Sequence, residues 1–580
     1  MGKRKRLLIL FLTAAALLLS ACARRPAEQS SQSEFNVFLN QIFTNEISKD
    51  ALSLHYLVAE PEKYGIAHAE TGFGEFGAEA QQRTGAEAEN YLAGLAAFSY
   101  KDLTEEQQLI YDILERALKA SLAMSEYPLY EEILGPTTGI QAQLPVLLAE
   151  YSLSDREDIE AYLTLLDDFD DYFMKIAEYE KEKSAAGLFM TDDTADSIIA
   201  QCRAFIADPE NNYLIGCFDD RLKEITQLSE EERERYREQN RELVQNNVIG
   251  AYEHLASVLS DLKGTGTEGA GLCRLELGTE YYELLVQTRI GSDRTIDEIR
   301  EMLTDALKDC LITLSGIVSR VPDIYTQYEA MEFPETDPSR SLDYLKEAVL
   351  ADFPPVSGDV SCDVRYIHES LQDYLSPAMY LIPPLDDYRN NCIYLNASPA
   401  YDLTTLFPTL AHEGYPGHLY QNVYFYSRDP EPVRSLLDIA GYSEGWATYA
   451  ELYSYELTGI SSELAAFLQA NILAAHCLYS LTDIGIHAEG WNTADTVSFL
   501  GAYGFSADTA GNIYQVMAAE PGMYLPYSVG CLEILALRDQ AEEELGDSFR
   551  LLDFHTFLLN CGPAPFDLIE ERMEQWLSEF

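Results

Sequence analysis

Apolar residues recur at helical spacing along most of the chain. In residues 154–187, 229–264 and 295–321 they return every three or four positions, with charged side chains between them. This spacing places an apolar stripe on one face of each helix and a solvated, charged face opposite it. Thr295 and Glu298 have the residue types and the separation of a capping box at the start of the third segment. The pattern therefore predicts a mainly α-helical protein.

Strand signals are confined to three short stretches in the second half of the chain. Residues 365–370, 378–384 and 391–397 are rich in β-branched and aromatic residues, and the third stretch is the strongest candidate. It lies just upstream of two histidines, His412 and His418. We therefore expect a small strand element next to the helix that carries these histidines.

The segment 353–360, FPPVSGDV, interrupts the helical pattern with prolines and a glycine. Such clusters are typical of connections between packed segments. The chain has 580 residues, which is too long for one simple core. We therefore predict a helical N-terminal half at 35–355 and a second half at 360–580 that contains the histidine pair.

The start of the chain has the organisation of an export signal. Four basic residues at 3–6 precede an apolar stretch at 7–19, which is too short for a convincing membrane span. Residues 1–21 are therefore interpreted as a signal peptide. The sequence LSAC resembles the lipobox of bacterial lipoproteins, with Cys22 as the lipidated residue; an ordinary signal peptide with a chance cysteine is the alternative. Residues 22–34 contain few apolar side chains and predict a flexible tether.

These features predict an extracytoplasmic lipoprotein of the bacterial cell membrane, held there only through its lipid anchor. The 39 Lys and Arg residues against 97 Asp and Glu residues give a formal net charge of −58. Nucleic acids and anionic lipid surfaces both require a basic surface, so neither is an expected partner. Nine cysteines follow Cys22 without any C-x-x-C pair, which argues against a cysteine-ligated metal.

The sequence HEGYPGH at 412–418 is similar to a zinc-peptidase signature with an unusual spacing. The H-E-x-x-H motif places its histidines four residues apart on one helical face. Six residues turn an α-helix through ~600° and rise ~9 Å, so a straight helix would point His412 and His418 in different directions. Pro416 removes a helical hydrogen bond and Gly417 accepts unusual backbone angles. A bulged or broken helix could therefore bring the two imidazoles together.

A third ligand is available 26 residues beyond the second histidine. Glu444 lies in a helix-like segment, and Glu451 follows it by seven residues, on the same face. We predict Glu444 as the ligand and Glu451 as the carboxylate that orients a ligand histidine. Glu413 would act as the general base, taking a proton from the attacking water and passing it to the leaving amine.

Several ordered motifs resemble one bacterial family, the domain-of-unknown-function family 885, whose members look like gluzincin zinc peptidases and are often lipoproteins. Its His-Glu-x-x-Pro-Gly-His pattern is matched at 412–418, and its Glu-Gly-Trp-Ala pattern at 444–447. Further segments match in order at 103–114, 376–396, 483–491, 527–530 and 554–571.

This resemblance implies a large, mainly helical, zinc-peptidase-like fold with a deep cleft, and makes 360–580 a metallopeptidase-like catalytic half. It also implies one Zn²⁺ held by His412, His418 and Glu444, hydrolysis of peptide bonds, and Glu413 as the general base.

A peptidase also requires a donor to the oxyanion of the tetrahedral intermediate. His487 follows Asp483 by four residues, so the carboxylate is expected to orient the imidazole on one helical face. Tyr527 is the second candidate donor. His476 stands beside a cysteine in an apolar helix and is interpreted as a core residue.

Three functions are compatible with the sequence. The leading hypothesis is a lipid-anchored zinc metallopeptidase that hydrolyses oligopeptides. The alternative is a catalytically inactive lipoprotein that binds peptides, and the presence of Glu413 between intact candidate ligands argues against it. A helical scaffold protein is the third interpretation, because two histidines near a Pro-Gly pair are, taken alone, more typical of a polar helix end.

Overall fold

The computed structural model describes residues 30–67, 72–266, 269, 271–369, 372 and 376–580. The predicted signal peptide, Cys22 and the first part of the tether lie outside the described residues. Residues 30–47 are helical, so the predicted flexible tether at 22–34 extends too far. Phe35 is fully buried in a small N-terminal core, and this packing extends the helix back to residue 30.

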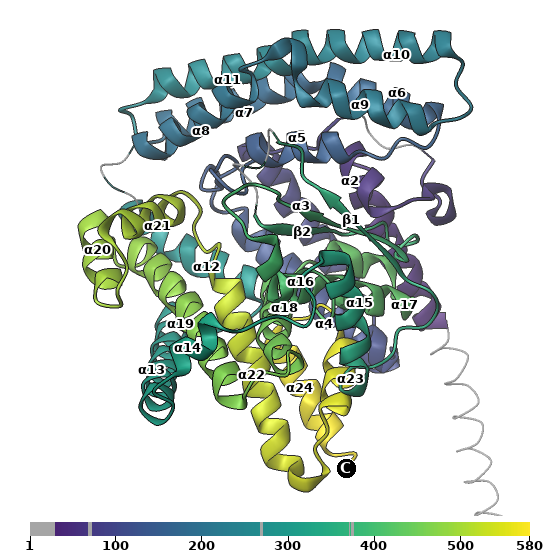
Figure 1. The fold of residues 1–580 in the computed structure, drawn as a ribbon. Helices are drawn as coiled ribbons and strands as arrows, with labels where there is room; N and C mark the ends of the chain where they lie inside the picture. Colours follow the sequence, from purple (N-terminus) through teal and green to yellow (C-terminus); the bar gives the residue numbers. More distant parts are fainter. Residues whose placement is uncertain (1–29, 68–71, 267–268, 270, 370–371, 373–375) are drawn as a thin grey trace, which may run out of the picture.

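The helices form an upper bundle and a larger lower body (Figure 1). The upper bundle lies across one end of the molecule and has its own hydrophobic core. It consists of α6 (Arg156–Asp167), α7 (Phe169–Ala185), α8 (Asp192–Phe205), α9 (Tyr213–Glu224), α10 (Glu230–Leu243) and α11 (Ile249–Leu262), with α5 (Ile140–Glu150) beneath it.

Of the two long helices predicted in this bundle, one is divided in the structure and the other is continuous. The segment predicted at 154–187 breaks at Asp168, where α6 ends and α7 begins. The segment predicted at 229–264 remains continuous, because a π-helical turn at Val244–Val248 joins α10 to α11. In both cases the helical periodicity is confirmed.

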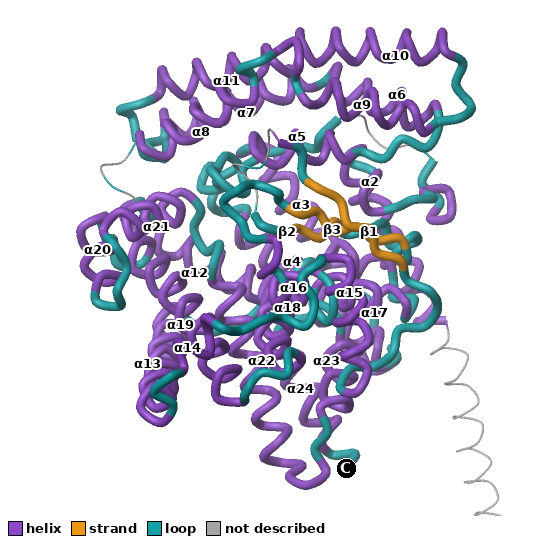
Figure 2. The backbone as a smooth tube through the Cα atoms, viewed as in Figure 1, coloured by secondary structure: helices purple, strands orange, loops and turns teal. Residues whose placement is uncertain are grey.

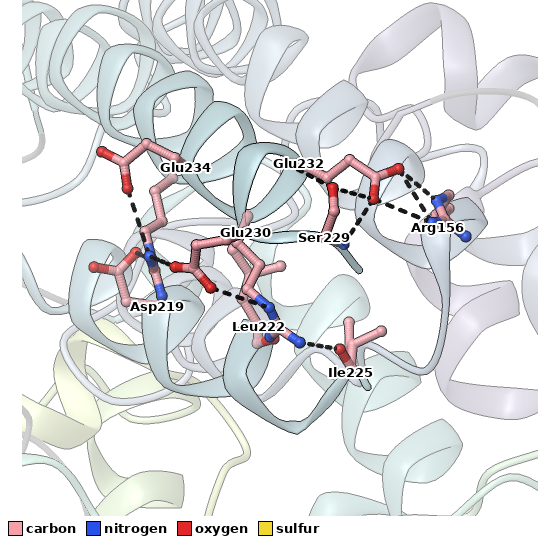
Figure 3. A network of polar contacts seen from close by, with 10 residues as sticks. Arg156, Asp219, Leu222, Ile225, Ser229, Glu230, Glu232 and Glu234 are labelled. Atoms are coloured by element: carbon pink, nitrogen blue, oxygen red, sulfur yellow. Dashed lines mark hydrogen bonds and ion pairs between the residues drawn. The ribbon is translucent and has the colours of Figure 1, made fainter. Parts of the chain in front are cut away.

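Arginines on the bundle connect its helix ends (Figure 3). Arg156 on α6 binds Glu232 on α10 at 3.1 Å, and Glu232 also completes the capping box of Ser229. Arg233 donates to the backbone carbonyls of Leu222 and Ile225 at the end of α9. These contacts satisfy carbonyls that a helix end leaves without partners.

The lower body combines helices from both halves of the sequence. Its earlier helices are α2 (Ala51–Leu57), α3 (Ala78–Leu95), α4 (Glu105–Met124), α12 (Gly278–Ile290), α13 (Ile296–Arg320), α14 (Ile324–Glu329) and α15 (Pro338–Ala348). Its later helices are α16 (Phe407–Glu413), α17 (His418–Ser427), α18 (Ala440–Ser454), α19 (Ser462–His487), α20 (Thr493–Gly501), α21 (Ala507–Ala519), α22 (Leu525–Leu545), α23 (Leu551–Cys561) and α24 (Phe566–Leu577). The capping box predicted at Thr295 and Glu298 opens α13.

The main core crosses the boundary predicted near 355–360. Tyr282 of α12 and Leu303 of α13 are fully buried in the same core cluster as Trp446 and Ile534. Helices α12 to α15 therefore pack with the second half of the chain. The predicted boundary is wrong as a division of the core, because a proline-rich connection marks the path of the chain rather than the partners of its helices.

A three-stranded sheet lies between the upper bundle and the helices of the lower body (Figure 2). It contains β1 (Ser361–Tyr366), β2 (Ala378–Leu381) and β3 (Asn390–Leu395) in the order β1-β3-β2. The central strand β3 pairs parallel with β1 and antiparallel with β2, and its Ile393 is opposite Val364 and Tyr380. The small strand element predicted from the sequence is confirmed, with β2 as an edge strand.

Helix α19 is the one described helix whose length and apolarity would suit a membrane span. Half of its most apolar 18-residue stretch is buried inside the protein. Its apolar residues pack in the main core and in two smaller clusters at its ends, which accounts for its composition.

Candidate metal site

The helix that carries the histidine motif is broken in two. Helix α16 ends at Glu413, and α17 begins at His418. The amide of Gly417 donates to the carbonyl of Ala411 at 2.9 Å, which folds the intervening loop tightly against the end of α16. A Cβ atom at Gly417 would lie 1.8 Å from the carbonyl oxygen of His412, so no side chain fits there. The predicted break at the Pro-Gly pair is confirmed.

The break brings the two imidazoles together. Their ring centroids lie 4.9 Å apart, and the rings are inclined at 84°. Nε2 of His412 lies 3.6 Å from Oε2 of Glu444, and Nε2 of His418 lies 3.4 Å from the same oxygen. Among the residues that the structure describes, these three form the one group of potential metal ligands whose donor atoms all lie within 4.8 Å of one another.

Helix α18 carries Glu444, and its close packing on neighbouring segments places this residue beside the histidines. The indole Nε1 of the fully buried Trp446 donates to the carbonyl of Pro416 at 2.8 Å. This bond fastens the loop between the histidines to the helix that carries Glu444. Gly445 lies against α22, where a Cβ atom would come within 2.3 Å of the Gly530 carbonyl carbon. The Glu-Gly-Trp sequence thus combines the candidate ligand with two residues that place its helix.

Glu451 occupies the position predicted for it. Its Oε2 lies 3.4 Å from Nδ1 of His412, on the opposite side of the imidazole from Glu444. A carboxylate at the second ring nitrogen fixes the tautomer and orientation of a ligand histidine. The seven-residue spacing on α18 therefore places one carboxylate at each nitrogen of His412.

Glu413 is held by the edge strand of the sheet. The backbone N–H of Tyr380 on β2 donates to its Oε2 at 2.8 Å. Burial raises the pKa of Glu413, although the nearby His412 and His418 act in the opposite direction. A raised pKa brings a carboxyl group closer to the range in which it exchanges protons at neutral pH.

The imidazoles and carboxylates of the site shift one another's pKa values. Burial acts to lower the pKa of His412, but Glu444 and Glu451 outweigh it and raise that pKa well above its ordinary value. Burial acts to raise the pKa of Glu444, but His418 and His412 hold it well below its ordinary value. The carboxylates around His412 therefore favour a positive charge at this imidazole.

Tyr527 on α22 lies beside the ligand group, as predicted. Its ring is nearly parallel to that of His412, with a centroid separation of 6.2 Å and an angle of 16°. Burial raises the pKa of Tyr527 well above its ordinary value, and the carboxylates of Glu444 and Glu413 add to the effect. The phenol therefore keeps its proton and can donate a hydrogen bond.

The prediction for His487 and Asp483 is wrong. Nε2 of His487 lies 2.7 Å from the carbonyl of Met517, and its Nδ1 accepts from the N–H of Leu272. Asp483 instead accepts from the Tyr282 hydroxyl and the Gly522 amide. Although the two residues are spaced for contact, each is hydrogen-bonded to other segments of the chain: His487 to two backbone groups, and Asp483 to one side chain and one backbone amide. His487 is 1 % exposed and serves packing.

His476 faces the site, although the sequence suggested a core residue. Its ring is parallel to that of Tyr527, with a centroid separation of 6.0 Å and an angle of 2°. Burial lowers the pKa of His476, while Glu451 and Glu444 act to raise it, so both carboxylates lie within electrostatic reach. The sequence did place His476 and His487 on nearly the same face of one helix, three turns apart. The face was therefore predictable, but not which of the two histidines lies at the level of the site.

The donor set fits a zinc ion. Zinc–ligand bonds of ~2.0–2.1 Å in a tetrahedral site place neighbouring donor atoms ~3.3–3.4 Å apart. The two separations to Glu444 Oε2, 3.4 and 3.6 Å, are close to that value. This oxygen is buried and has no hydrogen-bond partner within the described protein. Two imidazoles and one carboxylate are also a common set for catalytic zinc, which leaves a fourth position open.

The fold and the site together define a mainly helical protein with a candidate two-histidine, one-glutamate metal site. The sequence model of a family described as "Bacterial protein of unknown function (DUF885)" matches residues 62–573, so the chain belongs to this family. Among curated proteins, no significant match is found.

Two solved structures share the fold. A protein of Colwellia psychrerythraea, described as a candidate lipoprotein, has a TM-score of 0.82 at 18% identity, over 95% of this chain and 100% of that one. A candidate lipoprotein of unknown function from Shewanella oneidensis has a TM-score of 0.59 at 18% identity, over 86% of this chain and 92% of that one. At these identities the likeness supports the overall fold.

Proposed function

We propose that the protein is a lipid-anchored, extracytoplasmic zinc metallopeptidase that hydrolyses peptide bonds in oligopeptides. The observation that carries the proposal is the convergence of the His412, His418 and Glu444 donor atoms beside Glu413. A metal ligand group without a neighbouring base would support a structural role equally well. The deep peptide-binding cleft implied by the family resemblance belongs to this proposal.

Partial exposure of the ligand side chains supports access by a substrate. His412, His418 and Glu444 keep 12%, 15% and 25% of their side-chain surface exposed. Zinc held by these residues would supply Lewis acidity, polarising the scissile carbonyl and lowering the pKa of water. His412 would stay oriented through its Nδ1 contact with Glu451.

Two residues would handle the proton and the developing charge. Glu413 would accept the proton of the attacking water at a carboxylate oxygen and deliver it to the leaving amine. Its Oε2 is already held by the Tyr380 amide, which fixes the carboxylate. The protonated hydroxyl of Tyr527 would donate to the oxyanion, a contribution worth ~3 kcal/mol at sites of this kind.

The location rests on the leader sequence and on the two structural relatives. The lipobox-like LSAC with Cys22 is the feature of this chain that supports an anchor. Both relatives are described as candidate lipoproteins, which agrees with it.

The experiment compares wild type with Glu413→Gln, both loaded with zinc, on a library of short peptides. The peptidase proposal expects cleavage by wild type, and a loss of at least about 1,000-fold in Glu413→Gln with zinc content retained. A variant that binds zinc and cuts at the wild-type rate would remove Glu413 from the mechanism. Zinc-loaded wild type that binds peptides and cuts none would instead favour the peptide-binding alternative.

A further inference from the structure

We infer that His476 is a substrate-contacting residue of the site, which binds the peptide backbone on the side of Tyr527. The inference rests on the proposed peptidase function and extends it to a residue outside the family's His-Glu and Glu-Gly-Trp motifs.

His412, Tyr527 and His476 present three nearly parallel rings, with neighbouring centroids 6.2 and 6.0 Å apart. The last ring therefore lies at most ~12 Å from the first, a distance that three to four residues of extended peptide span at ~3.3–3.6 Å per residue. A substrate that reaches the ligands and extends along these three rings would reach His476 within a few residues of the cleaved bond.

Nδ1 of His476 is buried and has no hydrogen-bond partner within the described protein. The neighbouring positions Ala474 and Cys477 are buried in the apolar core. A buried polar atom without a partner destabilises a fold, whereas a phenylalanine or leucine would fill the same space without that penalty. Packing on Tyr527 alone therefore does not account for an imidazole here.

His476 as a residue is partly exposed, although its Nδ1 is buried. A neutral imidazole has one N–H donor and one acceptor nitrogen. The group that it would bind is a backbone amide of the substrate, which offers a carbonyl acceptor and an N–H donor at every residue. The surrounding carboxylates, Glu444 and Glu451, disfavour an acidic partner at this position.

Two substitutions separate substrate contact from packing. His476→Phe keeps a flat ring against Tyr527 and removes both nitrogens, whereas His476→Gln keeps a polar group and removes the ring. His254→Phe, at an exposed position on α11 in the upper bundle, is the matched control. All variants are loaded with zinc and compared for zinc content, Tm and kcat/KM on the library peptide that wild type cuts fastest.

Binding is measured separately from cleavage. A fluorescein-labelled copy of the same peptide is titrated, by fluorescence anisotropy, into Glu413→Gln protein with and without His476→Phe. We expect His476→Phe to weaken this binding about tenfold and to lower kcat/KM at least tenfold, corresponding to one lost hydrogen bond. The zinc content of His476→Phe should equal that of wild type, and its Tm should not fall, because the variant loses the unpartnered nitrogen. We expect His476→Gln to bind and cut better than His476→Phe, and His254→Phe to match wild type.

Wild-type binding and cleavage by His476→Phe, or a larger loss in His476→Gln than in His476→Phe, would overturn the inference and leave the peptidase proposal standing. If wild type neither binds nor cuts any library peptide, the proposed function fails and the contact inferred for His476 fails with it.

Discussion

Gly445 on α18 and Gly530 on α22 lie in direct backbone contact. A Cβ atom at Gly445 would come within 2.3 Å of the Gly530 carbonyl carbon, and one at Gly530 would lie 2.0 Å from the Gly441 carbonyl oxygen. Neither helix has a side chain at this crossing, so the two backbones approach closely. Glu444 and Tyr527 lie within three residues of the crossing and are thereby brought to one site. The close helix contact is therefore part of the metal site's construction.

Gly530→Ala should separate these helices and damage the site. The added methyl group has no space against the Gly441 carbonyl, and overpacking of this kind destabilises proteins by about 1–3 kcal/mol or more. We expect a lower Tm and a zinc affinity reduced at least tenfold, measured by competition with a chelating dye. Gly250→Ala on α11 is the control, since its Cβ meets nothing within 4 Å. Wild-type zinc affinity in Gly530→Ala would show that the crossing does not position the ligands.

Trp446→Phe should loosen the loop between the two histidines. The substitution keeps an aromatic ring in the core and removes the hydrogen bond to the Pro416 carbonyl. The carbonyl would lose a buried partner, at a cost of about 1–3 kcal/mol in the free energy of unfolding. Zinc affinity should fall with it, because His418 directly follows this loop. The control is Trp576→Phe on α24; equal effects of the two substitutions on zinc affinity would contradict the role of Trp446.

Glu451→Gln should weaken metal binding without abolishing it. The variant keeps an oxygen near Nδ1 of His412 and removes the charge that favours the orientation of this imidazole. Loss of such a carboxylate lowers metal affinity about 10- to 100-fold. The exposed Glu543→Gln on α22 should leave the affinity unchanged. A complete loss of zinc in Glu451→Gln would instead identify Glu451 as a direct ligand.

Glu180 in the upper bundle should make stability depend on pH. It is fully buried, both of its carboxylate oxygens have no hydrogen-bond partner, and burial raises its pKa from 4.5 to about 7. Between these values the folded state binds more protons than the unfolded state, so stability falls as pH rises. Glu180→Gln should remove a decline in the free energy of unfolding on the order of 3 kcal/mol as pH rises through this window.

The measurement is the difference in Tm between Glu180→Gln and wild type at pH 4.5, 6 and 8. The difference should be smallest at pH 4.5 and should grow, in favour of the variant, up to pH 8. A constant difference would mean that Glu180 does not titrate in this range. Glu178→Gln, at an exposed position on the same helix, provides the control for a general charge effect.

The sequence alone predicted those features of the site that depend only on residues close together in the chain. The Pro-Gly pair lies within the histidine motif, so a helix break between His412 and His418 follows from backbone chemistry. The seven-residue spacing of Glu444 and Glu451 places them on one face of a single helix. Neither inference needs knowledge of how distant helices pack.

The parts that failed depend on distant packing. His476 and His487 are eleven residues apart on α19, which keeps them on nearly the same face but separates them by ~16 Å along the axis. The sequence indicated the helix and the face, but the level at which α18 and α22 cross α19 is set by tertiary packing. For the same reason, the proline-rich segment 353–360 did not mark the boundary of the core.

The most direct test of the account is the metal content, by mass spectrometry, of the soluble chain from Ala23 onward, beside His418→Ala. About one zinc per wild-type chain, lost in the variant, is the predicted result. Wild-type protein that binds no zinc even after reloading would contradict the ligand assignment and, with it, the proposed peptidase.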